Sequence, residues 1–312
     1  MSYLFNAYSN RSPGAPWTTG AFTTSPGDVW WVNSVGGVND DAYGRTPTAP
    51  FASLNYAIAA ASAIQGDHIF LMPGHAETLF VANITLNKSN LTIEGLGNGG
   101  SRPTFRITAG PRCINVAADD VLISGLNVVG TINNLTTFFD VDNDDCTIDD
   151  CRMMTSAALE AYCFINLATG KDNLTVRNCT ALQPTDPEGA DGAAGTGFLY
   201  CEDSENILVE NCRIDGYFET GIFHNLTAAC AGLWIKDCYL RQVFAGGATI
   251  FELVAGATGG ITGSLGITVG AADVADASII GPIGDHFFIG ADSAFGNDGG
   301  GGQGAVRGTV AS

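Results

Sequence analysis

Residues 145–179 contain one seven-residue pattern twice, as DCTIDDC at 145–151 and as NLTVRNC at 173–179. In both copies the second, fourth and seventh residues are apolar, and the sixth is Asp150 or Asn178. Apolar residues at every second position predict a strand with one buried face. Asp and Asn tolerate a left-handed backbone conformation. The sixth residue is therefore expected to bend the chain sharply and to return the seventh side chain to the buried face.

The same pattern recurs on both sides of this stretch. The other copies are NLTIEGL (90–96), DVLISGL (120–126), NILVENC (206–212) and GLWIKDC (232–238), and successive copies start 30, 25, 28, 33 and 26 residues apart. Same-direction repeats of nearly constant length stack in parallel. The pattern therefore predicts an all-β parallel β-helix in which each repeat contributes one rung, meaning one complete turn of the chain around the helix axis. The sixth residues, all expected in the left-handed conformation, are Gly95, Gly125, Asp150, Asn178, Asn211 and Asp237.

The fifth position of the pattern should face solvent. From Asp149 onward its charge alternates in sign, which suits side chains stacked ~4.8 Å apart on neighbouring parallel strands. Additional strands are expected between the repeats, at 138–142, 163–168, 198–203, 222–227 and 250–255, so that a rung holds two or three strands. The fifth-position residues are Glu94, Ser124, Asp149, Arg177, Glu210 and Lys236.

The nine cysteines are expected to be thiols. Their number is odd, none falls in a CxxC pair, and the N-terminal residues lack a basic region followed by an apolar core, so the sequence predicts neither secretion nor a zinc site. Four of them occupy the seventh position of successive repeats, where we expect them to be inward, reduced and stacked as small hydrophobic residues. These four are Cys151, Cys179, Cys212 and Cys238.

Composition narrows the class of protein and of partner. The chain has 312 residues, of which 46% are hydrophobic and 14% charged, so a substantial core is expected. A net charge of −19 disfavours nucleic acid and anionic membranes as partners. No apolar run is long enough for a membrane span.

Both ends of the β-helix need a cover. Residues 53–65 predict a capping helix, with Ser53 as N-cap, Leu54, Ile58, Ala61 and Ile64 on one face, and Gly66 as a stop. Residues 67–74 should form the first strand and its turn. The predicted organisation is an N-terminal arm at 1–27, the β-helix at 28–259, and a Gly/Ala-rich C-terminal segment and arm at 260–312.

The beginning of the predicted β-helix resembles a known group of proteins. The motifs DVWWVNS (28–34), PFASL (50–54), GD (66–67), PGHAET (73–78) and RPTF (102–105) are similar to those of pectin-lyase-like, single-stranded, right-handed parallel β-helix proteins of tailed bacteriophages. The resemblance covers about residues 28–260. It implies a non-enzymatic structural protein of the virion, specifically a capsid decoration (cement) protein with extended terminal arms.

The resemblance also implies partners and a location. We expect a homo-oligomer, a trimer, that is made in the bacterial host cytoplasm and binds the major capsid protein or another virion protein at the capsid surface. The alternative is a tail spike or tail fibre protein that binds or degrades host polysaccharide. A free glycan lyase or hydrolase is a third class.

No catalytic, cofactor-binding or metal-binding residue is predicted. Glycoside hydrolysis needs two carboxylates about 5–9.5 Å apart. The chain offers acidic clusters at 140–150 and 202–205, mostly beside turns, but it lacks the Asn-Thr-Asp, Gly-His-Gly and Arg-Ile-Lys motifs of the group's hydrolases. His75 and Glu77 are expected to be structural. Asp140, Asp142 and Asp144 begin like a calcium loop, yet Asp145 and Cys151 exclude an EF-hand; a looser calcium site stays open.

The third position of the pattern suggests a subunit interface. It should face outward, and it holds threonine in three repeats and a large apolar residue in the others, namely Leu122, Leu208 and Trp234. Single exposed apolar residues are common on protein surfaces. Their alignment in one column equally favours packing against another β-helix, so these three residues are the candidate oligomer interface.

Overall fold

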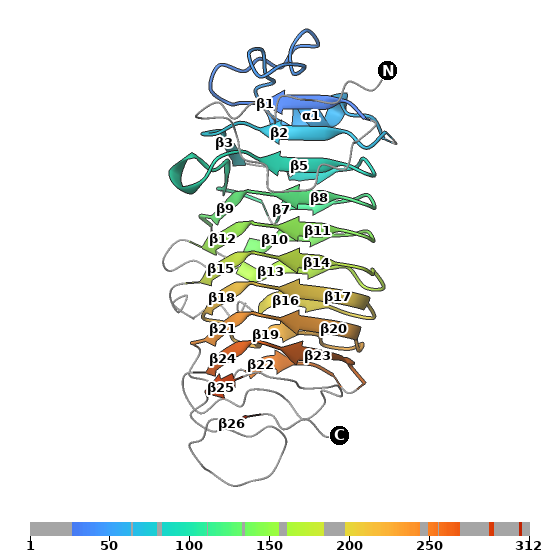
Figure 1. Cartoon of the computed structure of the whole chain (residues 1–312), viewed down its shortest axis with the longest axis vertical. Helices are drawn as coiled ribbons and strands as arrows, with labels where there is room; N and C mark the ends of the chain where they lie inside the picture. Colours follow the sequence, from blue (N-terminus) through green and yellow to red (C-terminus); the bar gives the residue numbers. More distant parts are fainter. Residues whose placement is uncertain are drawn as a thin grey trace.

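The computed structural model describes residues 27–63, 65–79, 83–110, 112–132, 135–155, 161–183, 197–243, 249–254, 256–268, 287–289 and 306–307. These residues form a stack of rungs in which each rung passes through three parallel sheets (Figure 1). The predicted all-β parallel β-helix is confirmed. In the described part of the chain, no helix is long and apolar enough to cross a membrane.

Sheet 1 carries the repeats. In spatial order it contains β1 (Val29–Val32), β2 (His68–Leu71), β5 (Thr92–Gly95), β8 (Leu122–Ser124), β11 (Thr147–Asp149), β14 (Thr175–Arg177), β17 (Glu205–Glu210), β20 (Ala231–Lys236) and β23 (Gly259–Thr262).

Sheet 2 follows the corner that ends each repeat. It contains β3 (Ala76–Leu79), β6 (Thr104–Ile107), β9 (Asn127–Gly130), β12 (Arg152–Thr155), β15 (Thr180–Gln183), β18 (Arg213–Gly216), β21 (Tyr239–Gln242), β24 (Leu265–Thr268), β25 (Phe287–Ile289) and β26 (Val306–Arg307), of which only the β25–β26 pair is antiparallel among these described strands.

Sheet 3 completes the rung. It contains β4 (Ile84–Leu86), β7 (Arg112–Val116), β10 (Leu135–Val141), β13 (Ala161–Leu167), β16 (Gly197–Cys201), β19 (Gly221–His224) and β22 (Thr249–Glu252). The five additional strands that the sequence predicts between repeats coincide with β10, β13, β16, β19 and β22. Each rung from β2–β3–β4 to β20–β21–β22 therefore has three strands.

The predicted register of sheet 1 is confirmed. The third-position residues Thr92, Leu122, Thr147, Thr175, Leu208 and Trp234 are successive Cα partners, and so are the fifth-position residues from Glu94 to Lys236. The fourth-position residues between them face inward and are fully buried. This inner file of β-branched side chains, which suit a pleated and buried surface, is Ile93, Ile123, Ile148, Val176, Val209 and Ile235.

The corner prediction holds for five of the six repeats. Gly125, Asp150, Asn178, Asn211 and Asp237 have φ between 45° and 74°. The prediction is wrong for Gly95, which lies outside the left-handed region and extends β5 in register with Leu71. Glycine is needed there for space, because a Cβ on Gly95 would lie 2.3 Å from the carbonyl oxygen of Gly125.

A second left-handed column lies at the first position of each repeat, before the strand in the first four copies and within β17 and β20 in the last two. The first residue of every repeat has φ between 57° and 70°, and the sequence prediction missed this feature although the residue types are again Asn, Asp and Gly. Every repeat therefore begins with a left-handed residue, and every repeat except the first, where Gly95 is extended, also has one at its sixth position. The first-position residues are Asn90, Asp120, Asp145, Asn173, Asn206 and Gly232.

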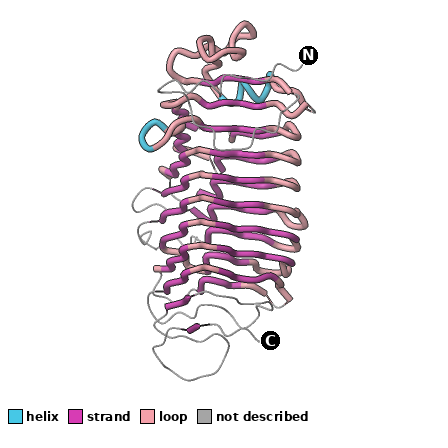
Figure 2. The backbone as a smooth tube through the Cα atoms, in the orientation of Figure 1, coloured by secondary structure: helices cyan, strands magenta, loops and turns pink. Residues whose placement is uncertain are grey.

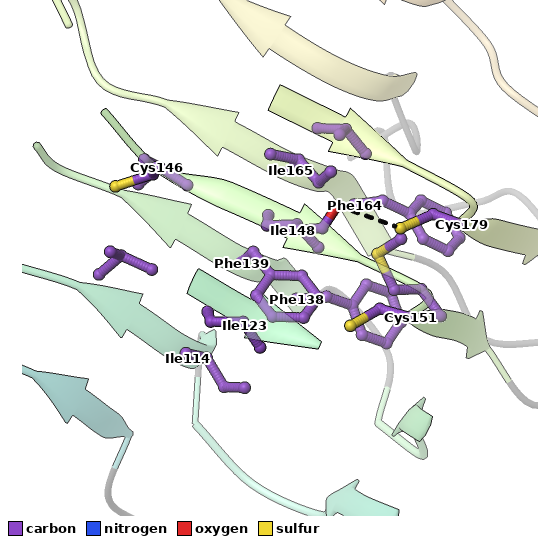
Figure 3. Packing of buried hydrophobic residues seen from close by; sticks show 14 of the residues in the cluster. Ile114, Ile123, Phe138, Phe139, Cys146, Ile148, Cys151, Phe164, Ile165 and Cys179 are labelled. Carbon is purple, nitrogen blue, oxygen red and sulfur yellow. Dashed lines mark hydrogen bonds between the residues drawn. The ribbon is translucent and has the colours of Figure 1, made fainter. Parts of the chain in front are cut away.

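The seventh-position side chains point into the core. All nine cysteines are free thiols and buried, and Cys151, Cys179, Cys212 and Cys238 are at most 3% exposed. Figure 3 shows Cys151 and Cys179 beside the rings of Phe138 and Phe164, whose centroids are 4.8 Å apart. Burial raises the pKa of the Cys179 thiol well above its ordinary value. The predicted inward file of reduced thiols is confirmed.

The two ends of the stack differ from the sequence prediction. The capping helix is shorter than 53–65: α1 spans Leu54–Ala60 and, with the short η2 (Gly99–Ser101), lies toward the N-terminal end (Figure 2). The first strand of sheet 1 is β1 and not residues 67–74, which form β2 and its turn. The stack also continues beyond residue 259 through β23 and β24. Residues 1–26 and most of 269–312, including most of both predicted arms, lie outside the described residues.

Candidate functional site

The motifs at 28–34, 50–54, 66–67 and 73–78 form a cap at the N-terminal end of the β-helix. The Asp67 carboxylate is buried and accepts hydrogen bonds from the backbone N–H of Asp28 (2.8 Å), the indole N–H of Trp30 (2.9 Å) and the backbone N–H of Ser62 (2.8 Å). Trp30 also stacks on Phe51, with 5.6 Å between ring centroids. One buried carboxylate thus joins β1, the segment after α1 and β2.

His75 and Glu77 belong to the same cap. The backbone N–H of Ser34 donates to Nδ1 of His75 (2.9 Å), and Nε2 of His75 lies 2.9 Å from Oε1 of Glu77. The same Oε1 accepts the backbone N–H of Leu54 (2.6 Å), the first residue of α1. Ser53 stands at the N-cap position but makes no side-chain cap, so Glu77 takes over that role. The structural interpretation of His75 and Glu77 agrees with these contacts.

Acidic side chains of residues 140–150 form hydrogen bonds to neighbouring rungs. Asp140 accepts an amide N–H of Asn166 (2.6 Å), Asp142 accepts one of Asn115 (2.9 Å), and Asp144 accepts the backbone N–H of Asp172 (2.9 Å). In the described part of the chain, no group of three or more His, Cys, Asp and Glu side chains is arranged to hold a metal ion. These carboxylates therefore have partners on the adjacent rungs.

A polar cluster on sheet 3 was not predicted from the sequence. His224 on β19 is fully buried, and neither ring nitrogen has a hydrogen-bond partner among the described residues. Burial lowers the pKa of His224 to about 4, and the charge of Glu202 opposes that shift. Its ring lies 5.0 Å from the ring of Tyr200 on β16, the strand of the preceding rung.

The Glu202 carboxylate joins this cluster to the turn that follows β19. Oε1 accepts the backbone N–H groups of Leu226 (3.1 Å) and Thr227 (2.8 Å) and the Thr227 hydroxyl (2.9 Å). Burial raises the pKa of Glu202, but the hydrogen bonds from Tyr200, Thr227 and Leu226 outweigh it and lower the pKa overall. The pKa of the Tyr200 hydroxyl is raised by burial and by its bond to Glu202. The cluster thus holds an ionised carboxylate beside an imidazole with free ring nitrogens.

The sequence contains a signal for this cluster. FLYCED (198–203) and IFHNLT (222–227) are both predicted strands, and stacking them in register pairs Tyr200 with His224. Glu202 is already among the noted acidic residues. What the sequence cannot supply is the space for the ring, which Gly197 provides, because a Cβ there would lie 2.6 Å from Nδ1 of His224.

The candidate interface residues lie on the outer face of sheet 1. Leu208 and Trp234 are direct Cα partners on β17 and β20, and Trp234 is 38% exposed. Together with Asn206, Ile207 and Lys236 they line a shallow depression. Leu122 lies in the same column but is separated from Leu208 by Thr147 and Thr175. The structure therefore brings two of the three residues together.

No protein-family model and no curated protein matches the sequence. Among solved structures, a rhamnogalacturonan lyase superposes with a TM-score of 0.52 at 14% identity, covering 79% of this chain and 75% of that one. A pectin methylesterase from carrot superposes with a TM-score of 0.51 at 11% identity, covering 89% and 85%. The fold is a pectin-lyase-like parallel β-helix. At these identities the likeness shows the fold alone.

Proposed function

We propose that the protein is a non-enzymatic structural component of a tailed-bacteriophage particle, namely a capsid decoration protein that binds the outer shell as a homo-oligomer. The N-terminal motifs support the phage origin through their resemblance, and the structure gives them a role in capping the β-helix. The observation that carries the proposal is the outward column of sheet 1, where Trp234 and Leu208 present adjacent apolar side chains on a rigid surface.

The hydrogen bonds that the acidic side chains make support a non-enzymatic role. Asp140, Asp142 and Asp144, which the sequence offers for hydrolysis, accept hydrogen bonds from neighbouring rungs. These carboxylates link one rung to the next and so help to make the β-helix a long rigid rod. A protein that spans neighbouring capsid subunits requires such a rod.

Locating the protein in intact particles tests this proposal. Phage particles labelled with an antibody against the β-helix, or imaged by cryo-electron microscopy with and without the gene, should show the protein distributed over the capsid. A location confined to the tail tip, or absence from purified particles, would refute the decoration role.

A second candidate is a tail spike or fibre that binds or degrades host polysaccharide. The observation that favours it is the Tyr200–Glu202–His224 cluster, since an ionised carboxylate beside an imidazole is a common acid–base arrangement. A rhamnogalacturonan lyase, which by its name acts on a polysaccharide, has the same fold. Incubation with host capsular and O-antigen polysaccharides should give no new reducing ends or unsaturated uronates. Turnover that is lost in Glu202→Gln would favour the second candidate.

A further inference from the structure

The outer face of sheet 1 from β11 to β20 carries charges in a self-complementary order. The fifth-position column reads Asp149, Arg177, Glu210 and Lys236 on four successive strands. Reversing the column exchanges Asp149 with Lys236 and Arg177 with Glu210, so every position meets the opposite charge. A second copy turned end for end would therefore find a complementary column.

The neighbouring third-position column is self-complementary in size. It reads Thr147, Thr175, Leu208 and Trp234 on the same four strands. The same reversal places Trp234 against Thr147 and Leu208 against Thr175, so each large apolar side chain meets a small one. Charge and size are independent properties, and both columns are complementary about the same level, midway between β14 and β17.

We infer that two copies of this chain pair face to face through sheet 1, antiparallel, about a two-fold axis that runs along the strands between β14 and β17. This arrangement rests on the proposed function, because it specifies how the outward apolar column forms a homo-oligomer. A two-fold contact is isologous, so one surface serves both partners. Copies related by an axis along the β-helix, as in the trimer implied by the resemblance, keep equal rungs level and bring Asp149 near Asp149 and Lys236 near Lys236.

The size of the face sets the expected affinity. Four strands spaced ~4.8 Å apart, each spanning up to about 15 Å, form a patch of about 300 Å² on each partner, which is smaller than the usual specific interface. The pair should therefore be weak in dilute solution and be favoured when many copies are held close together on a particle. Measurements need protein concentrations that extend well above the micromolar range.

The test uses two charge reversals that lie three strands apart within one copy. In Lys236→Glu the antiparallel pair would bring Glu against Asp149 twice, and in Asp149→Lys it would bring Lys against Lys236 twice. Sedimentation velocity of the full chain should show each variant alone self-associating about tenfold or more weakly than the parent. An equimolar mixture should recover the association, because both contacts of the mixed pair are then of opposite sign. Lys88→Glu, a reversal in the turn after β4, serves as the control and should leave association unchanged.

The outcomes separate this inference from the proposed function. A two-copy mass together with recovery in the mixture supports the antiparallel pair. A trimer mass, or association that is insensitive to Lys236→Glu, overturns the antiparallel pair and leaves a decoration role intact. Monomers at every concentration overturn both the pair and the use of this face for an oligomer, whereas the capsid location is decided by particle imaging. Circular dichroism of Asp149→Lys monitors folding, since Asp149 also binds Arg177 and Asn178 within its own chain.

Discussion

At the scale of single residues, the stacked thiols are tied to the corner that precedes them. Cys179 donates to the carbonyl of Arg177 (3.2 Å) on its own strand and to that of Ile148 (3.6 Å) on the preceding strand, and Cys212 and Cys238 make the same two contacts on their own rungs. A thiol is a weak donor that is small enough to fit behind a bend. These contacts explain why cysteine recurs where the sixth residue is Asp or Asn.

Replacing Cys179 with Asp should destabilise the protein strongly. The carboxylate would enter the core among apolar side chains and buried thiols, and the free energy of unfolding should fall by about 3 kcal/mol or more. Thr175→Asp places a carboxylate four residues earlier in the chain but facing outward. It should lower the free energy of unfolding much less. Equal shifts of the urea unfolding midpoint in the two variants would contradict the inward position of Cys179.

His224 makes stability depend on pH. Its pKa is lowered from 6.5 to about 4 by burial, so the folded protein binds this proton more weakly than the unfolded chain does. The stability that results is present above pH 6.5 and is lost as pH falls from 6.5 towards 4, by about 3 kcal/mol in total. In His224→Gln this part of the pH dependence should disappear. Urea unfolding at pH 7, 5.5 and 4.5 checks the difference, and parallel pH profiles of the two proteins would show that His224 is not the group responsible.

At the scale of elements, the strands of sheet 1 were predictable and their corners only in part. The period-two apolar pattern and the recurrent Asp, Asn or Gly at position six were enough to place β5, β8, β11, β14, β17 and β20 in register. Residue type alone could not show that Gly125 combines a left-handed φ with a close approach to Gly95, whereas Gly95 is needed for space alone. That distinction depends on the neighbouring rung.

The corners at Gly95 and Gly125 differ from the later ones because their two backbones approach each other closely. A Cβ on Gly125 would lie 2.4 Å from the carbonyl oxygen of Gly95. Beyond Gly125, the buried Arg102 binds both carboxylate oxygens of Asp150, at 3.0 and 2.8 Å, and its backbone carbonyl. A bidentate pair of this kind is among the stronger side-chain contacts. Small residues in these two rungs leave room for it.

Replacing Gly125 with asparagine, a residue that later repeats have at this corner, should therefore destabilise the protein. Gly125→Asn keeps a residue type that tolerates φ of +74°, yet its side chain would collide with Gly95, and the free energy of unfolding should fall by about 2 kcal/mol or more. The reverse change, Asn178→Gly, removes exposed hydrogen bonds to Asp149 and Asn211 and should cost less than about 1 kcal/mol. Thermal denaturation of both variants gives the comparison; a neutral Gly125→Asn would contradict the close approach.

At the scale of the whole molecule, the nearly constant repeat length made the architecture predictable. The structure of the two ends was not predictable in the same way. A rung recurs and so can be recognised in sequence. The cap occurs once, and its key contacts join residues distant in sequence, as when Glu77 binds the first N–H of α1 or Asp67 binds Trp30. The helix was predicted, but its end at Ala60 and its capping carboxylate depend on these contacts.

Removing residues 1–27 should separate folding from seating on the particle. The deletion keeps Asp28, Trp30 and Ser62, whose N–H groups bind the Asp67 carboxylate, so the β-helix should keep its circular dichroism spectrum and its melting temperature. If the predicted arm attaches the protein to the shell, occupancy on particles should fall sharply, measured by quantitative gel analysis of purified virions. Full occupancy after the deletion would contradict attachment through this arm.

The Arg102–Asp150 pair has a further consequence for how the stack comes apart. In a solenoid whose rungs interact only with their nearest neighbours, the rungs at an end unfold one at a time. The loss of one rung then has no direct effect on the rung two positions away. Arg102 precedes β6 and Asp150 follows β11, so this contact links rungs that are not adjacent. Losing the rung of β5 and β6 therefore removes a partner from the rung of β11 as well as from the adjacent rung of β8. Opening at this end is thereby cooperative over three rungs, and the N-terminal end resists stepwise unravelling.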